Sequence, residues 1–147
     1  MGKTIGEIIQ GRSEFYRVSS SDSVILACQY MHERKVGAVA VQDGNGNCCG
    51  VFSERDLLNR VVASGKDPSR TSVGDVMTRK LVTARPEESG LVAAARMKEK
   101  GTRHLLVMDG ERSLGMVTQS DLTKSFLDEA SAERDLLRHY AFPELAD

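Results

Sequence analysis

The chain has 147 residues, which is enough for one compact domain or for two small halves that share a core. Its formal net charge of −1 provides no basic field to attract nucleic acid, and no apolar run approaches the roughly 20 residues that span a bilayer. The first ten residues also lack the apolar core of a secretory signal. We therefore expect a soluble cytoplasmic protein that binds neither membrane nor nucleic acid.

The three cysteines are an odd number and form no CxxC pair. This usage favours reduced thiols over a disulfide framework or a zinc site, so we expect no metal. Cys48 and Cys49 are neighbours on a predicted strand and would point to opposite faces. We interpret them as structural, with redox sensing as the alternative.

The first half predicts a short helix, an extended segment, a longer helix and two strands. Isoleucines at helical spacing lie within residues 1–9, and residues 15–19 form a short extended segment. An apolar stripe with helical spacing covers residues 24–31. Residues 36–41 and 48–52 are apolar runs on either side of a DGNGN turn, which predicts a hairpin.

The second half repeats this order. SVGDVM resembles the earlier TIGEII, and the apolar helix positions recur at an offset of 66 residues. After the hairpin the offset is 65, because the second turn is one residue shorter. The polar segment SGKDPSR separates the copies. The repeated elements are predicted at 72–77, 80–84, 93–97, 104–108 and 114–117.

Two matching corners end the hairpins, GVFSERD at 50–56 and GMVTQSD at 115–121. A hydroxyl residue followed three positions later by aspartate fits a capping box at the start of a helix. Capping alone can explain the pattern. The same hydroxyl, carboxylate and free helix N–H groups can also hold a sugar hydroxyl pair and a phosphate.

Together with GDVMT at 74–78 and TRHLLV at 102–107, these corners resemble tandem CBS domains, also called a Bateman module. The resemblance covers roughly residues 3–127 and leaves no attached catalytic domain, so we expect a stand-alone pair. It implies an α/β (α+β) fold of two pseudo-twofold related β-α-β-β-α units packed through their sheets, with two clefts between them. The expected boundaries are 1–64 for the first domain, 65–71 for the linker, 72–127 for the second domain and 128–147 for a C-terminal helix and tail.

In this family the clefts commonly bind adenosine-containing ligands such as AMP, ADP, ATP, NAD or S-adenosylmethionine. The resemblance implies that the corner aspartates receive the ribose hydroxyls and that the VT pair of KLVTA lines the adenine. An aspartate suits ribose because its oxygens accept from both vicinal hydroxyls. The implied ligand-binding residues are Val18, Ser19, Ser53, Asp56, Val82, Thr83, Arg103, His104, Thr118 and Asp121.

Charge placement differs between the repeats. Arg103 and His104 precede the second hairpin, whereas Gly37 and Ala38 occupy the aligned positions of the first. In relatives a basic pair here often reaches phosphates. An ordinary solvated strand end with surface charge is the alternative interpretation.

We expect a non-catalytic, energy-sensing regulatory module that binds an adenine nucleotide as a ligand and not as a cofactor. Binding is expected to change the packing of the two repeats, and an unidentified protein partner is expected to recognise that change. A ligand-independent dimerisation scaffold with degenerate pockets is the alternative. The sequence contains no paired nucleophile and base and no nucleotide-binding glycine loop, so it predicts neither catalytic residues nor an enzyme. A homodimer is expected from the family and from an apolar face on the C-terminal helix at Leu136, Leu137 and Tyr140.

Overall fold

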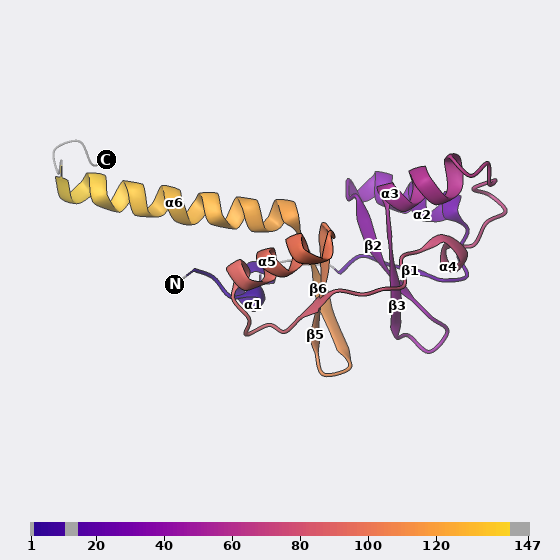
Figure 1. Ribbon diagram of the computed structural model, residues 1–147, viewed down its shortest axis with the longest axis horizontal. Coiled ribbons are helices and arrows are strands. Elements are labelled where there is room, and N and C mark those ends of the chain that lie inside the picture. The colour runs from indigo at the N-terminus through magenta and orange to yellow at the C-terminus, as the bar shows by residue number, and fades with distance from the viewer. Residues whose placement is uncertain (1, 11–14, 142–147) are drawn as a thin grey trace.

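The computed structural model describes residues 2–10 and 15–141 and contains two sheets of three strands each. The strand orders are β1-β2-β3 and β4-β5-β6 (Figure 1). In both sheets the first pair is parallel and the second is an antiparallel hairpin. The duplicated α/β fold predicted from the sequence is thereby confirmed.

The first sheet follows the chain order that the hydrophobic pattern predicts. A helix crosses between the two parallel strands, as a parallel connection requires, and a tight turn joins the hairpin. The register shifts between Val41 and Gln42, where the hairpin contains an irregularity. The elements are β1 (Arg17–Ser19), α2 (Val24–Arg34), β2 (Ala38–Gln42) and β3 (Cys48–Ser53).

The second sheet repeats the topology and a register shift, here between Val107 and Met108. Helices α2 and α5 both begin at a serine cap and both end at a residue in the left-handed conformation, Lys35 and Gly101. The elements are β4 (Thr83–Ala84), α5 (Gly90–Lys100), β5 (His104–Asp109) and β6 (Arg112–Thr118).

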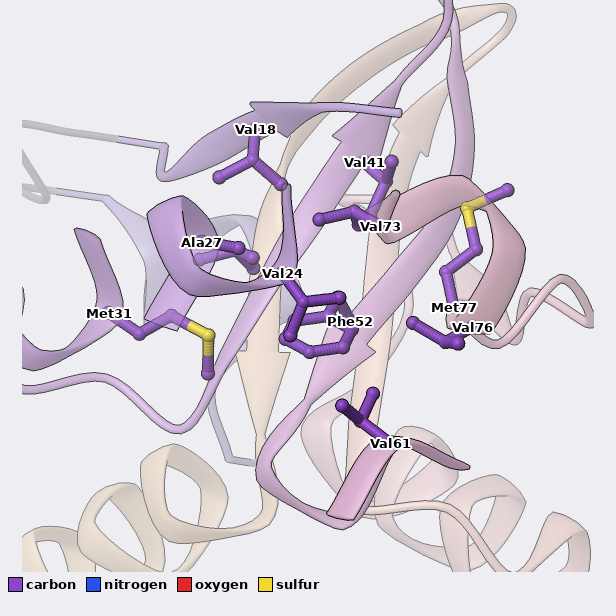
Figure 2. Close-up of a cluster of buried hydrophobic side chains, with 11 residues drawn as sticks. Val18, Val24, Ala27, Met31, Val41, Phe52, Val61, Val73, Val76 and Met77 are labelled. Carbon is purple, nitrogen blue, oxygen red and sulfur yellow. The ribbon is translucent and has the colours of Figure 1, made fainter. Parts of the chain in front are cut away.

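The two short lead-in helices, α1 (Ile5–Ile9) and α4 (Val73–Val76), are exchanged between the repeats. Ile5 is buried in the core of the second repeat, and Val73 is buried in the core of the first. Figure 2 shows Val73 and Val76 beside side chains of the first sheet. A backbone hydrogen bond of 2.8 Å, from Ile5 N to Glu88 O, holds α1 against the second repeat. Each hydrophobic core therefore contains residues of its own sheet and of the lead-in helix that precedes the other repeat in sequence.

The helix after the first corner changes its winding. A short α-turn, α3 (Glu54–Asp56), continues as a π-helix, η1 (Leu57–Val62), where the sequence predicted an ordinary helix. Val61 of this segment is fully buried in the core. Arg60 donates to the carbonyls of Val76 and Met77, at 3.4 and 2.7 Å. The wide turn thus packs the segment against the end of α4.

The helix after the second corner, α6 (Gln119–Ala141), is continuous for 23 residues. The sequence interpretation divided the chain at residue 128 and expected a separate C-terminal helix there. Because the segment contains neither glycine nor proline, nothing interrupts its backbone hydrogen bonding. Its distal half is exposed and extends away from both sheets (Figure 1). Within the residues described, no helix is long and apolar enough to cross a membrane.

Candidate ligand-binding site

The first corner is a complete capping box. Ser53 Oγ accepts from the backbone N–H of Asp56 at 3.4 Å, and Asp56 Oδ2 accepts from the backbone N–H of Ser53 at 3.0 Å. The Ser53 hydroxyl also donates to the same carboxylate oxygen, at 3.2 Å. The predicted cap is thus present, and it holds the aspartate in one orientation.

Asp56 has additional partners from beyond its own corner. Thr78, which follows α4, donates its hydroxyl proton to Asp56 Oδ1 at 2.9 Å, and Arg60 Nε lies 3.7 Å from the same atom. Only 6% of Asp56 is exposed. A carboxylate offers about four acceptor positions. Ser53, Thr78 and Arg60 therefore occupy most of the hydrogen-bonding capacity of this group.

The second corner has the same reciprocal bonds but a more open aspartate. Asp121 Oδ2 accepts from the backbone N–H of Thr118 at 2.8 Å, and Thr118 Oγ1 accepts from the backbone N–H of Asp121 at 3.1 Å. Both residues are half-buried. The two corners thus share the reciprocal capping bonds and differ in how deeply the carboxylate is enclosed.

His104 interacts with both corners. It is the cross-strand partner of Thr118, and the negative charge of Asp56 acts on its imidazole from the other repeat. Burial lowers the pKa of His104, and this effect outweighs the opposing influence of Asp56. The positive charges of Arg103 and Arg55 lower that pKa further. The ring is therefore neutral at pH 7 and can both donate and accept.

Arg103 itself is exposed, and its carbonyl accepts from the backbone N–H of Gln119 at 2.9 Å. The equivalent bond in the first repeat joins Glu54 N to Gly37 O at 3.0 Å. The backbone of each hairpin therefore anchors the first turn of its own corner helix. On the hairpin side of this junction the second repeat has Arg103 and His104, whereas the first has Gly37 and Ala38.

The remaining predicted residues are less uniform. Val18 is a core residue with 7% exposure, and Ser19 Oγ lies 2.9 Å from Ser21 Oγ. Val82 packs partly against the second core and its carbonyl accepts from Leu106 N, while Thr83 is exposed.

Among the surface cavities in the described residues are two of about 420 and 450 Å³, and none of the ten predicted residues lines either one. The larger is formed on α6 by Gln119, Ser120 and neighbours, directly beside the second corner. The smaller lies at the turn ends of the hairpins.

Sequence reasoning missed Thr78 and Arg60 as partners of the first corner. Thr78 is part of the GDVMT motif that indicated the family, but the motif does not show that its threonine bonds to Asp56. The cysteines are free in the structure, and burial raises the pKa of all three thiols, which disfavours the reactive thiolate. No group of three or more potential metal ligands occurs among the described residues.

The duplicated sheets with two capped aspartate corners define a tandem α/β module. The chain belongs to the CBS domain family, whose model matches residues 5–63 and 73–128. This confirms the resemblance read from the corner motifs.

Named relatives carry the same domains. The chain is 32% identical over 126 residues to the mitochondrial CBS domain-containing protein CBSX3 of Arabidopsis thaliana, covering 83% of this chain and 61% of that protein. It is 30% identical to CBS domain-containing protein YhcV of Bacillus subtilis, covering 78% of this chain and 81% of YhcV. The chain thus spans about three fifths of CBSX3.

Solved structures agree with the fold. A CBS-domain protein from Burkholderia ambifaria superposes with a TM-score of 0.81 at 32% identity, covering 86% of this chain and 95% of that one. The structure of CBSX2 in complex with AMP superposes with a TM-score of 0.72 at 27% identity, covering 88% of this chain and 99% of CBSX2.

Proposed function

We propose that this chain is a non-catalytic regulatory module that binds an adenosine-containing ligand, such as AMP, ADP, ATP, NAD or S-adenosylmethionine, between its repeats. The observation that supports it best is the position of His104, which pairs with Thr118 of one corner and feels the charge of Asp56 in the other. A neutral imidazole can donate to a phosphate oxygen, while the neighbouring corner carboxylates accept from the ribose hydroxyls. The AMP bound by CBSX2 supports the same class of ligand.

The two corners are proposed to contribute unequally. Asp121 is the better ribose acceptor because it is half-buried, whereas Asp56 is nearly enclosed. A ribose at Asp56 would have to share or replace the bond from Thr78. Ser53 and Thr118 hold the two carboxylates, and Arg103 with His104 supplies contacts to phosphate. Val18, Ser19, Val82 and Thr83 remain the proposed adenine segments.

The experiment is a titration of the full chain with AMP, ATP, NAD, S-adenosylmethionine and adenosine, monitored by melting temperature and calorimetry. A ligand at about 100 times its dissociation constant stabilises the folded state by about 2.7 kcal/mol. Asp121→Ala removes charge-assisted hydrogen bonds worth about 1.5–3 kcal/mol each, so we expect binding to weaken about 10- to 150-fold. Asp56→Ala is the matched variant and is expected to weaken binding less. Wild-type affinity in both folded variants would leave capping as the only role of the corners.

A scaffold function is the second candidate, supported by exposed apolar side chains at equivalent positions of the two repeats. Ile25 aligns with Leu91, and Leu26 aligns with Val92, on α2 and α5. Such a repeated apolar face supports homodimerisation. Light scattering with and without nucleotide tests it, and a monomer at high concentration would contradict it. A cytoplasmic location and a regulated protein partner also remain proposals.

A further inference from the structure

A polar cavity of about 420 Å³ lies between the turn ends of the two hairpins. Figure 1 shows both turns at the same end of the molecule, opposite the ends of β3 and β6 that enter the corner helices. Ser53 in the corner lies five positions after Cys48, which lines the cavity, or roughly 17 Å along the extended strand. The cavity therefore shares no lining residue with the proposed adenosine site and lies well away from its corners, although Arg17 directly precedes Val18.

Both repeats build this cavity from equivalent positions. Asn47 and Cys48 of the first hairpin line it, and so do Arg112 and Ser113 of the second. The offset of 65 residues aligns Asn47 with Arg112 and Cys48 with Ser113. The cavity is thus lined by equivalent positions of the two hairpins, and a ligand there would contact both repeats.

Positive charge breaks that symmetry. Arg17 on β1 and Arg112 on β6 both line the cavity, with Glu111 as a single acidic neighbour. The Arg17 guanidinium lies over the ring of Phe15, with 4.9 Å from its central carbon to the ring centroid. In the part of the chain that the structure describes, neither arginine forms an ion pair. Two guanidinium groups are therefore available to one anion.

We propose that this cavity binds a small phosphate monoester across the two repeats. A phosphate monoester carries nearly two negative charges and three strong acceptor oxygens, and guanidinium forks match its oxygens. Arg17 and Arg112 supply the charge, and the Ser113 hydroxyl and Asn47 amide supply further donors. The volume lies within the range of small-molecule sites, about 300–1,000 Å³. Glu111 disfavours more highly charged anions by repulsion.

Because its donors come from both hairpins, this ligand would stabilise one packing of the repeats. The same packing sets how Asp56 and His104 approach each other at the opposite ends of the strands. Occupation of the cavity and of the corners is therefore expected to be thermodynamically coupled, with each ligand changing the affinity of the other by the same factor.

The test uses ribose 5-phosphate as probe and ribose as its unphosphorylated control. Arg17→Thr and Arg112→Asn replace each arginine by the residue at the equivalent position of the other repeat, Thr83 and Asn47. Arg70→Asn, in the exposed linker, is the control for lost charge. We expect saturable stabilisation by ribose 5-phosphate and none by ribose. Each cavity variant should bind about tenfold more weakly or worse, and Arg70→Asn should match the wild type.

A second readout locates the ligand. Cys48 lines the cavity and Cys28 lies on α2, so ribose 5-phosphate should slow alkylation of Cys48 and leave Cys28 unchanged. The proposal would be overturned if stabilisation of the wild type did not saturate, or if both arginine variants bound ribose 5-phosphate as tightly as the wild type. It would also be overturned if Cys48 were alkylated at the same rate with and without ribose 5-phosphate. Asp121→Ala separates the two sites, because it should weaken AMP binding and leave ribose 5-phosphate binding intact.

Discussion

Thr78 and Asp56 join the two halves of the chain through one hydrogen bond of 2.9 Å, from Thr78 Oγ1 to Asp56 Oδ1. The residues are 22 positions apart and belong to the segments that precede and follow the linker. The bond is charge-assisted and part-buried, so it contributes more than an ordinary surface contact. It also commits a carboxylate of the candidate site to a structural partner.

Thr78→Val should therefore destabilise the fold. It removes the hydroxyl but keeps the shape, and it leaves a nearly enclosed carboxylate with one donor fewer. We expect the free energy of unfolding to fall by about 1.5–3 kcal/mol, measured by urea denaturation. Thr71→Val is the control, because its hydroxyl bonds only to an exposed carbonyl, Asp67 O. Equal losses in the two variants would contradict a special role for the Asp56 contact.

The leading glycines of the two corner motifs should respond differently to alanine. A Cβ on Gly50 would lie 2.5 Å from Met77 Sδ and 2.8 Å from Thr78 O. That carbonyl is fixed by its hydrogen bond from Val51, so it cannot retreat without breaking the bridge. We expect Gly50→Ala to lower the free energy of unfolding by about 1–3 kcal/mol.

Gly115→Ala is the matched variant in the second motif. Its Cβ would meet only Ile9 Cδ1, at 3.7 Å, which is ordinary contact. A change below about 0.5 kcal/mol is expected in the same denaturation experiment. Similar effects at both glycines would show that the close approach at Gly50 is readily relieved.

The helix ends offer a stabilising substitution. Lys35 ends α2 with φ of 56° and ψ of 43°, where the equivalent end of α5 has Gly101. A side chain in this left-handed region is strained by roughly 1–2 kcal/mol, and glycine is not. We expect Lys35→Gly to raise the free energy of unfolding by about 0.5–1 kcal/mol, after part of the gain is lost to greater unfolded-state entropy.

Gly101→Lys is the reverse exchange and should lower stability by a similar amount. Both variants can be compared by thermal melting. A rise in melting temperature for the lysine variant at position 101, or a fall for the glycine variant at position 35, would contradict the conformational argument.

His104 should make stability depend on pH. Because burial depresses its folded-state pKa below about 6.5, the unfolded chain binds a proton more readily than the folded one. Stability is therefore lost as pH falls from about 6.5 through the folded pKa, and His104→Gln should flatten this part of the profile. His32→Gln, which removes an exposed imidazole on α2, is the control substitution.

The basic pair should distinguish phosphorylated from unphosphorylated ligands. Arg103→Ala and His104→Ala are expected to weaken AMP binding by about tenfold and to leave adenosine binding nearly unchanged, because their donors would contact only the phosphate. Calorimetry with both ligands measures the ratio. Equal losses for AMP and adenosine would show that these residues act through folding.

Local patterns in the sequence predicted the elements and the caps. Alternating and helical apolar spacing located both hairpins, and the Ser53-to-Asp56 spacing predicted a capping box that the structure contains. These features depend on residues a few positions apart, so the chain itself carries the information. Duplication then extended each inference to the second repeat.

The long-range partners could not be read in the same way. The similarity of TIGEII to SVGDVM revealed equivalent segments, but an amphipathic segment shows which side chains it buries and not which core receives them. The same limit hid the bond from Thr78 to Asp56. The π-helical winding of η1 was not indicated by residue propensity, and Arg60 of this segment bonds to carbonyls at the end of α4, 16 and 17 positions later.

The exchanged lead-in helices also govern the order in which the chain can fold as it leaves the ribosome. The first sheet cannot complete its core until residue 77 has emerged, because Val73, Val76 and Met77 fill it. Ile5 is synthesised before every other buried residue of its core, yet that core also needs Leu122, more than a hundred residues later. Helix α1 must therefore wait until residue 122 has been made before its core is complete, and a nascent product that stops at the linker lacks part of the first core as well.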